Sequence, residues 1–150
     1  IATLHEKMKN KRDNFKHNES SKLVNEFDRI YMEDLNVAGM TKSAKGTVDN
    51  PGKNVKQKSG LNKSILDVGF GGFKNMIEYK TKFNNKEVVF VDRFFASSKT
   101  CNNCGTKNKD LKLSDRIWIC SNCGAELDRD ENAAKNIKAE GRKSLMTAKK

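Results

Sequence analysis

The four cysteines of the sequence form two pairs with the spacing of metal ligands. Each pair has two intervening residues, in TCNNCGTK and ICSNCGAE, and fifteen residues separate the pairs. Two such turns can aim four thiolates at one ion, and zinc prefers a tetrahedral set of four ligands. We therefore expect a zinc ribbon over residues 99–125, with a short strand in DRIWIC. Two disulfides are the alternative, which is disfavoured because nothing marks the chain as secreted. The predicted zinc ligands are Cys101, Cys104, Cys120 and Cys123.

Acidic residues at two other places could bind a divalent cation. Glu33 ends the apolar segment RIYMEDL, where a carboxylate is costly unless it meets a cation. Asp128 and Asp130 flank Arg129 at the start of the helical pattern DENAAKNI. An aspartate at this place is also a common N-terminal helix cap, and a glutamate after a strand is often a rim residue. The residues alone leave these interpretations open.

The chain carries a strong positive charge. Its formal net charge is +11 and its sequence pI is about 9.6, which favours a polyanion as partner, most commonly nucleic acid. The stretch 41–60 contributes five lysines and a single acid, Asp49. A basic surface kept for solubility is the alternative. The candidate nucleic-acid-binding residues are Lys42, Lys45, Lys53, Lys56 and Lys58.

The sequence has none of the marks of a membrane or secreted protein. No apolar run approaches the roughly 18 residues that a membrane helix needs. The first segment is charged throughout, which is unlike a signal peptide. The chain starts at Ile1 rather than Met, and we expect it to be a piece of a longer protein.

Alternating helices and strands must position these residues. Apolar spacing distinguishes the helices from the strands. The expected elements are a helix over 1–27, with a break near Asn18 as one option, a strand over 28–33, a helix over 61–82, a strand over 87–92 and a helix over 130–140. The Gly, Asn, Pro and Lys content of 41–60 predicts irregular backbone. This order indicates an α/β layer fold.

Several stretches together resemble one family. EDLNVAGM, VDRFFASSKTCNNCG and ICSNCGAELDRDENAAKNI, with LHEKMKNKRDNFKHNESSKLVNEFD before them, are similar to the C-terminal half of the TnpB/OrfB transposon-encoded proteins. That family comprises RNA-guided DNA nucleases related to type V CRISPR effectors. The resemblance implies an incomplete RuvC-like, RNase H-type fold over 1–98 and 126–150, the latter including a basic tail, with the zinc ribbon inserted at 99–125. It also implies a DNA target, a guide RNA and a prokaryotic, cytoplasmic setting.

The same resemblance implies a second metal site. In this family three acidic residues hold two magnesium ions, and by motif match Glu33 is the second acid and Asp130 the third. The first acid is expected on a strand upstream of the opening helix, in an Asp-x-Gly setting. Asp67 in ILDVGFGG has a similar setting, but it lies after Glu33 in a segment that is helical by period. We therefore expect Asp67 to take no part in the site.

Three hypotheses about function follow. The first is the nuclease half of an RNA-guided DNA endonuclease that hydrolyses phosphodiesters with magnesium and is inactive as this isolated piece. The second is a zinc-ribbon module that binds nucleic acid without catalysis, from a decayed transposase gene. The third, a zinc ribbon that serves only protein contacts, leaves the charge of +11 and the setting of Glu33 unexplained.

Overall fold

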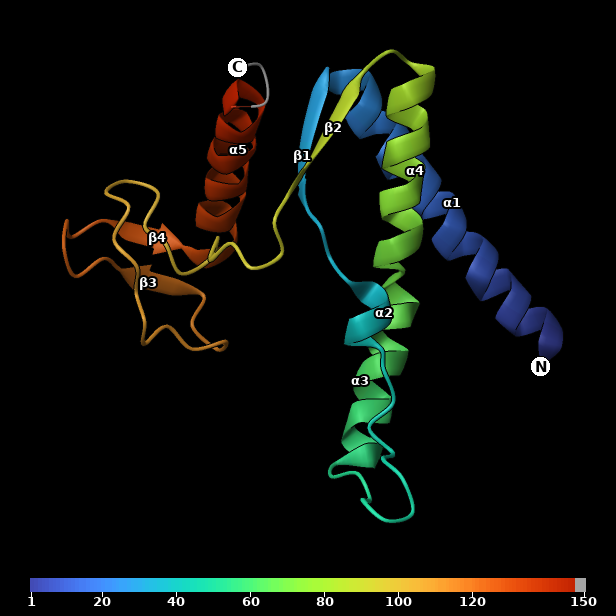
Figure 1. Cartoon of the computed structure of the whole chain (residues 1–150). Helices are drawn as coiled ribbons and strands as arrows, with labels where there is room; N and C mark the ends of the chain where they lie inside the picture. Colours follow the sequence, from blue (N-terminus) through green and yellow to red (C-terminus); the bar gives the residue numbers. More distant parts are fainter. Residues whose placement is uncertain (148–150) are drawn as a thin grey trace. The chain divides into compact units, whose positions relative to one another are not determined.

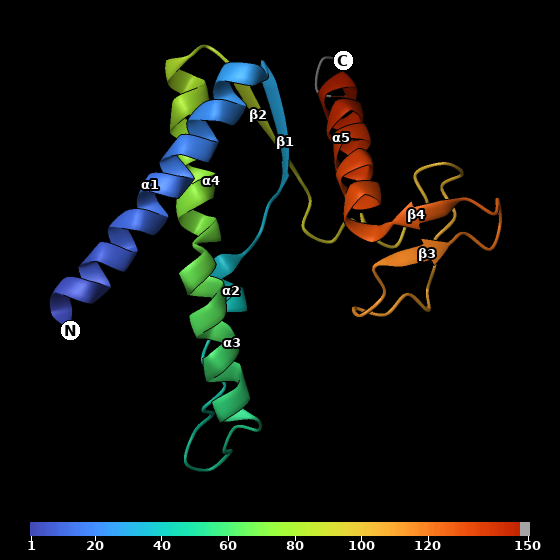
Figure 2. The same cartoon turned by 180° about the vertical axis from the view of Figure 1, so that it is seen from behind.

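The computed structural model describes residues 1–147, so the last three residues of the expected basic tail lie outside the described residues (Figures 1 and 2). The chain divides into two compact units. The first comprises residues 1–30 and 35–88, and the second comprises residues 31–34 and the chain from residue 89 onward. Within the described part, no helix combines the length and the apolar character needed to cross a membrane.

A pair of long helices forms the centre of the first unit. Helix α1 (Ala2–Glu26) packs against α4 (Phe70–Phe83), as both views of the chain show (Figures 1 and 2). Val24 and Ile77 are fully buried. The option of a break near Asn18 is wrong, because the Asn18 amide donates to Asn14 Oδ1 one turn back (2.8 Å) rather than competing for the helix backbone.

Two lysines hold the C-terminal half of α1. Lys80 Nζ donates to the backbone oxygen of His17 (2.6 Å) and to the hydroxyl of Ser20 (2.7 Å). Lys86 Nζ donates to the backbone oxygen of Val24 (2.7 Å), near the helix end where a positive charge is favourable. Part of the positive charge of this chain therefore stabilises the fold.

The basic stretch is more regular than its composition predicts. Helix α3 (Val55–Val68) begins inside it, so the prediction of irregular backbone is wrong for the residues after Asn54. A short helix, α2 (Val37–Met40), was also not expected. The Asn62 amide on α3 donates to the backbone oxygen of Thr41 (2.7 Å), so long-range contacts order this part of the chain. Between α3 and α4 the helical path breaks at Gly69, where φ is 72°.

Two parallel strands agree with the predicted ones. Strand β1 (Arg29–Glu33) pairs with β2 (Glu87–Val91). The Glu87 N–H donates to the backbone oxygen of Asp28 (3.0 Å), and the Asp34 N–H donates to that of Val91 (2.9 Å). Both strands therefore run in the same direction, and Glu33 is the last residue of β1.

A second, antiparallel pair and one long helix belong to the second unit. Strand β3 (Ile117–Ile119) confirms the strand in DRIWIC and pairs with β4 (Glu126–Asp128), which the sequence did not reveal. Helix α5 (Arg129–Thr147) follows β4 directly and extends beyond the predicted helix. Mixed helices and strands confirm the α/β class.

Helix α5 meets β1 at a glycine. Gly141 is buried, and a Cβ atom placed on it would lie 2.4 Å from Cδ1 of the Tyr31 ring. A methyl group cannot fit at that distance, so only glycine allows the ring to approach the helix backbone. This approach places Tyr31 beside α5, and Tyr31 is two residues before Glu33 on β1.

Replacing Gly141 should reveal this contact. Alanine usually stabilises a helix interior relative to glycine by roughly 0.5–1 kcal/mol. At Gly141 the clash with Tyr31 should reverse the sign, and Gly141→Ala should lower the free energy of unfolding by about 1–3 kcal/mol. The matched control is Gly60→Ala on α3, which has open space around the new methyl group and should stabilise. Urea denaturation measures both, and a stabilised Gly141→Ala protein would contradict the contact.

Candidate metal centres

The two cysteine pairs form two equivalent turns. The Gly105 N–H donates to the backbone oxygen of Cys101 (2.8 Å), and the Gly124 N–H donates to that of Cys120 (2.9 Å). Both glycines have positive φ angles, 77° and 70°, which a side chain would strain. We call these turns the first and second knuckle, over 101–105 and 120–124.

The knuckles bring all four sulfur atoms together. The sulfurs lie within 4.8 Å of one another, and no other group of three or more His, Cys, Asp or Glu side chains in residues 1–147 is placed to hold a metal ion. Cys101 Sγ is 3.7 Å from Cys123 Sγ, far longer than a disulfide bond of about 2 Å. Sulfurs bound to one tetrahedral zinc at about 2.3 Å would lie roughly 3.8 Å apart. The cluster therefore fits a metal ion and contains no disulfide.

Cys101, Cys104 and Cys123 differ in how readily they ionise. Hydrogen bonds with Thr106 and Asn122 lower the pKa of Cys104 to about 5. A hydrogen bond from the Ala125 backbone lowers the pKa of Cys123, whereas burial raises the pKa of Cys101 to about 11. The two exposed thiols, Cys104 and Cys123, are thus more readily available as thiolates to an entering cation than Cys101.

A small apolar core supports the knuckles. Cys101, Leu111, Trp118 and Cys120 are buried against one another, and Leu127 packs on them. So few apolar residues supply little folding energy, and a bound metal would supply much of the rest.

Asn132 ties the first knuckle to α5. Its amide nitrogen donates to the backbone oxygen of Thr100 (2.7 Å), and its Oδ1 accepts from the backbone N–H of Asn102 (2.8 Å). These two backbone groups lie on either side of Cys101. A single side chain, 2% exposed, therefore fixes the backbone around one predicted zinc ligand.

Asn136, one turn further along α5, forms further hydrogen bonds to the same segment. Its amide nitrogen donates to the backbone oxygens of Ser97 (2.8 Å) and Thr100 (2.6 Å). Sequence reasoning missed Asn132 and Asn136. Their spacing of four residues places both on one face of a helix directly after the cysteine module, which could have marked them.

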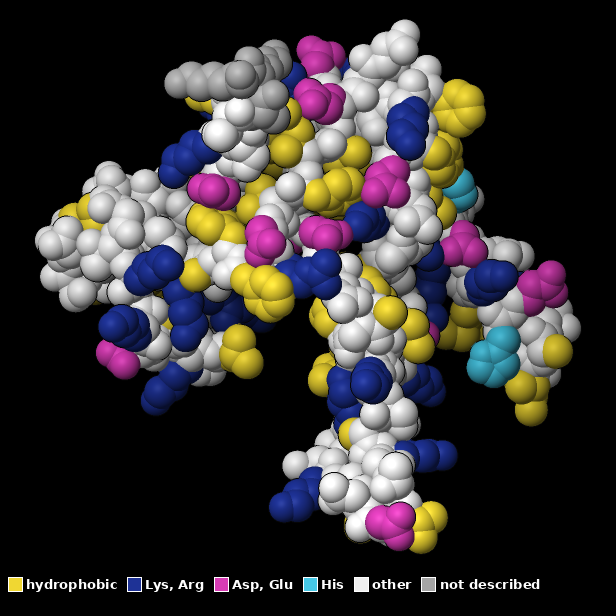
Figure 3. Space-filling model, viewed as in Figure 1, with side chains coloured by type: hydrophobic (Ala, Val, Ile, Leu, Met, Phe, Trp, Pro, Cys, Tyr) yellow, Lys and Arg dark blue, Asp and Glu magenta, His cyan; other side chains and the backbone are white. Residues whose placement is uncertain are grey.

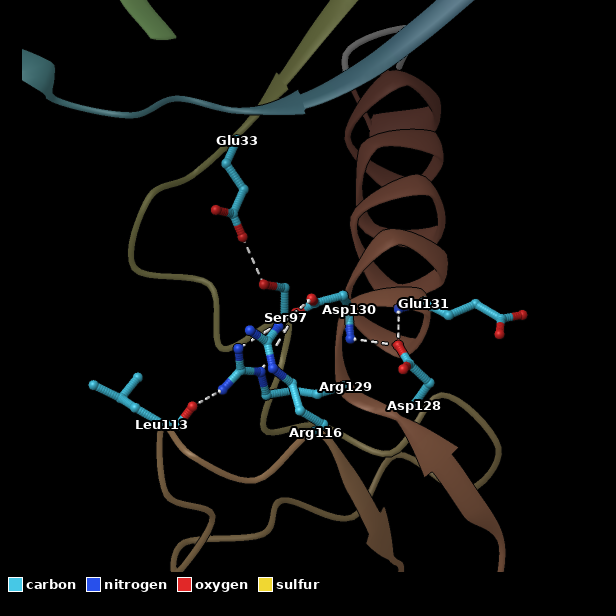
Figure 4. A network of polar contacts seen from close by, with 8 residues as sticks. All are labelled: Glu33, Ser97, Leu113, Arg116, Asp128, Arg129, Asp130 and Glu131. Atoms are coloured by element: carbon cyan, nitrogen blue, oxygen red, sulfur yellow. Dashed lines mark hydrogen bonds and ion pairs between the residues drawn. The ribbon is translucent and has the colours of Figure 1, made fainter. Parts of the chain in front are cut away.

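Glu33 points toward the segment that precedes the first knuckle. Its Oε1 accepts a hydrogen bond of 2.6 Å from the hydroxyl of Ser97, a residue that is 6% exposed (Figure 4). Glu33 and Asp130 line one pocket of about 280 Å³. The pocket also contains positive charge, from Lys99, Lys112 and Arg129. The structure thus brings the two predicted acids to one cavity within the second unit.

The cap of α5 is Asp128, which leaves Asp130 available. Asp128 Oδ1 accepts from the backbone N–H groups of Asp130 and Glu131, both at 2.9 Å (Figure 4). The capping role that the sequence left open for Asp130 therefore belongs to its neighbour. The Asp130 carboxylate instead forms ion pairs with Arg116 (3.2 Å) and Arg129 (3.4 Å), and its side chain is 67% exposed.

Asp67 belongs to the first unit. It lies on α3, as expected, and its carboxylate pairs with Arg12 of α1 at 2.8 Å. Both residues line an apolar groove of about 670 Å³ between the helices, together with Phe15, Phe70 and other side chains. The Asp67 carboxylate is therefore paired with an arginine side chain.

The predicted nucleic-acid-binding lysines occupy the basic stretch and the start of α3, where Lys and Arg side chains are visible on the surface (Figure 3). Lys58 is half-buried and donates to the backbone oxygen of Met40, so it has a structural contact. The other four are exposed, and Lys45 and Lys56 line one pocket of about 480 Å³.

Comparison with known proteins identifies the family. Residues 70–137 match the family model described as Cas12f1-like, TNB domain. A candidate RNA-guided DNA endonuclease of Streptomyces pristinaespiralis is 37% identical over 141 residues, which cover 94% of this chain and 31% of that protein. The candidate RNA-guided DNA endonuclease InsQ of Escherichia coli is also 37% identical, over 94% of this chain and 35% of the relative. A TnpB-like protein of Acanthamoeba polyphaga mimivirus is 37% identical over 91% of this chain and 24% of the relative. The chain belongs to the TnpB-like family.

This membership confirms the resemblance drawn from the sequence motifs. The TnpB-like chain spans about a third or less of the length of these relatives. The names of the first two relatives state RNA guidance and DNA cleavage. Both properties are therefore attributed to this chain only as a proposal.

Metal analysis tests the cysteine cluster. We expect one zinc per chain by elemental analysis, and Cys104→Ser or Cys123→Ser should abolish it and increase hydrogen exchange over residues 99–125. Ser121→Ala, in the exposed turn of the second knuckle, is the control that should keep its zinc. Metal-free protein with two intact disulfides would contradict the site.

Proposed function

We propose that this TnpB-like chain is the nuclease half of a transposon-associated, RNA-guided DNA endonuclease. Residues 1–98 and 126–150 would form part of a RuvC-like nuclease domain, and residues 99–125 its zinc ribbon. Glu33 and Asp130 would be ligands of catalytic Mg²⁺, and the four cysteines would bind zinc. The observation that carries the proposal is the shared pocket of Glu33 and Asp130, two acids that are distant in the sequence.

The donor set of the pocket suits a hard cation. Carboxylate oxygens are the ligands that Mg²⁺ prefers, and it usually binds one or two carboxylates and keeps several waters. Bound Mg²⁺ would activate water and neutralise negative charge on the phosphodiester. Arg129 and Lys112, which line the same pocket, would attract the phosphate electrostatically.

The number of carboxylates limits what the isolated chain can do. Two-metal hydrolysis needs carboxylates that hold both ions about 4 Å apart. Within the described residues, no third acid gathers with Glu33 and Asp130 closely enough to complete such a group. We therefore expect residues 1–150 alone to show no appreciable Mg²⁺-dependent cleavage, and the complete protein to supply the remaining acid.

Carboxylate substitutions in the complete protein with its guide RNA test the site. Glu33→Ala and Asp130→Ala should each abolish cleavage and spare DNA binding, because they remove metal ligands rather than nucleic-acid contacts. Asp128→Ala removes the cap of α5, so it should cost about 1 kcal/mol of stability and impair cleavage less than Asp130→Ala. Plasmid cleavage and gel-shift assays measure the two activities, and Asp67→Ala is the control that should still cut.

Two outcomes would contradict this assignment. Robust cleavage by residues 1–150 alone that is lost in Asp67→Ala would show that the acids are misplaced. Unchanged cleavage by Glu33→Ala and Asp130→Ala would show that these two acids are not catalytic. A complete protein that binds DNA and never cuts it would favour the alternative, a zinc-ribbon module that binds nucleic acid without catalysis.

Salt dependence tests the proposed nucleic-acid interface. Binding to duplex DNA should weaken steeply with salt, because phosphate contacts release counterions. Changing the five predicted lysines to glutamine should make the slope of log affinity against log salt shallower, by about 0.9 for each phosphate that is no longer neutralised. Lys80→Gln is the control: Lys80 is bonded to α1, so its replacement should lower thermal stability and leave the slope unchanged. Affinity that is flat across salt concentrations would contradict this mode of binding. The five lysines are Lys42, Lys45, Lys53, Lys56 and Lys58.

A further inference from the structure

Ser97 contacts both a proposed catalytic acid and the helix that carries the other. Its hydroxyl donates to Glu33 Oε1 at 2.6 Å. Its backbone oxygen accepts from the Asn136 amide on α5 at 2.8 Å. Asp130 lies in the first turn of the same helix. A continuous set of hydrogen bonds therefore connects the Glu33 carboxylate to the helix of Asp130.

The hydroxyl of Ser97 can do little else than hold Glu33. Ser97 is 6% exposed, so water has little access to compete for its hydroxyl proton. A hydroxyl has a single proton to donate, and here the acceptor is a carboxylate, which makes the bond strong. With one oxygen held by Ser97, the carboxylate loses rotational freedom and its orientation in the pocket is fixed.

The same set of contacts includes the first knuckle. Asn136 bonds the backbone oxygen of Thr100 as well as that of Ser97, and Asn132 holds the backbone on both sides of Cys101. The segment that presents the Ser97 hydroxyl is therefore the segment that leads into the cysteine cluster. An ordered first knuckle therefore fixes the position of Ser97, and Ser97 in turn fixes the orientation of the Glu33 carboxylate.

We propose that Ser97 is a positioning residue that orients Glu33, from a backbone held by Asn136, so that Glu33 and Asp130 bind one divalent cation. This inference rests on the proposed function, because it assumes that the two acids are metal ligands. Residues that orient metal ligands typically change metal affinity or activity by 10–100-fold when they are removed. Ser97 acts through Glu33 and needs no contact with the cation or the DNA.

Mn²⁺ binding followed by electron paramagnetic resonance tests this role without relying on turnover. The measurement uses the complete, zinc-loaded protein with its guide RNA. Ser97→Ala should weaken Mn²⁺ binding about 10-fold. It should retain zinc and DNA binding, because the backbone contacts of Ser97 remain. Ser97→Thr, which keeps a hydroxyl, should bind Mn²⁺ like the unchanged protein.

Two further variants separate positioning from general structural damage. Ser98→Ala changes the adjacent serine, which lines the same pocket and makes no side-chain hydrogen bond within residues 1–147, and should leave Mn²⁺ binding unchanged. Adding Ser97→Ala to Glu33→Gln should produce no further loss, because Ser97 acts only through the Glu33 carboxylate.

The outcomes distinguish this inference from the proposed function. Unchanged Mn²⁺ binding by Ser97→Ala, or an equal loss in Ser98→Ala, would overturn the positioning role. An additional loss on top of Glu33→Gln would overturn it as well. If Glu33→Gln and Asp130→Asn themselves bind Mn²⁺ normally, the acids are not ligands, and the proposed function fails before Ser97 is considered.

Discussion

Two asparagine side chains of α5 hydrogen-bond to the segment from Ser97 to Asn102, and the rest of the second unit depends on this contact. It satisfies backbone groups of Ser97, Thr100 and Asn102, and the Ser97 oxygen belongs to a buried residue, so losing its partner would be costly. Because Asp130 precedes these asparagines on the same helix, the first knuckle and the acid are fixed by one element. This explains why the cysteine module and the acidic motif are adjacent in the sequence.

The ion pairs of Asp130 could be exchanged for a bound divalent cation. Asp130 pairs with Arg116 and Arg129, but its side chain is largely exposed, and pairs of this kind contribute little to stability. A divalent cation could replace them at small cost. The freed arginines would then remain beside the phosphate of a bound nucleic acid. Glu33 differs, since its partner is a neutral hydroxyl that can continue to donate when a cation binds.

Local signals in the sequence predicted much of this fold. The paired cysteines, the apolar strands at β1 and β2 and the helical period of α1 and α5 are properties of contiguous residues, and the structure agrees with them. Features that depend on distant contacts could not be predicted in the same way. Helix α3 begins in a stretch of loop-like composition because its side chains bond α2 and the turn after it. The choice of Asp128 over Asp130 as the cap depends on which carboxylate faces the free N–H groups, and both spacings permit a cap. The structure places Glu33 and Asp130 in one pocket, which no periodicity in the sequence indicates; only the family motif singled out these two residues beforehand.

The contacts of the second unit also set an order in which it can assemble. The bond between Ser97 and Glu33 closes a loop of 64 residues, whereas Cys101 and Cys123 are 22 residues apart and Asn136 and Thr100 are 36 apart. Closing a loop costs conformational entropy that grows slowly with its length. A metal bound across the knuckles would cross-link Cys101 to Cys123 and shorten the remaining path from Thr100 to Asn136 from 36 to 14 residues, because 22 of the 36 would be bypassed. Because the cost of closure scales with the logarithm of loop length, this would lower the entropic cost of the later step by about 1 kcal/mol. The pocket of Glu33 and Asp130 would then form last, on a metal-bound module that has already folded.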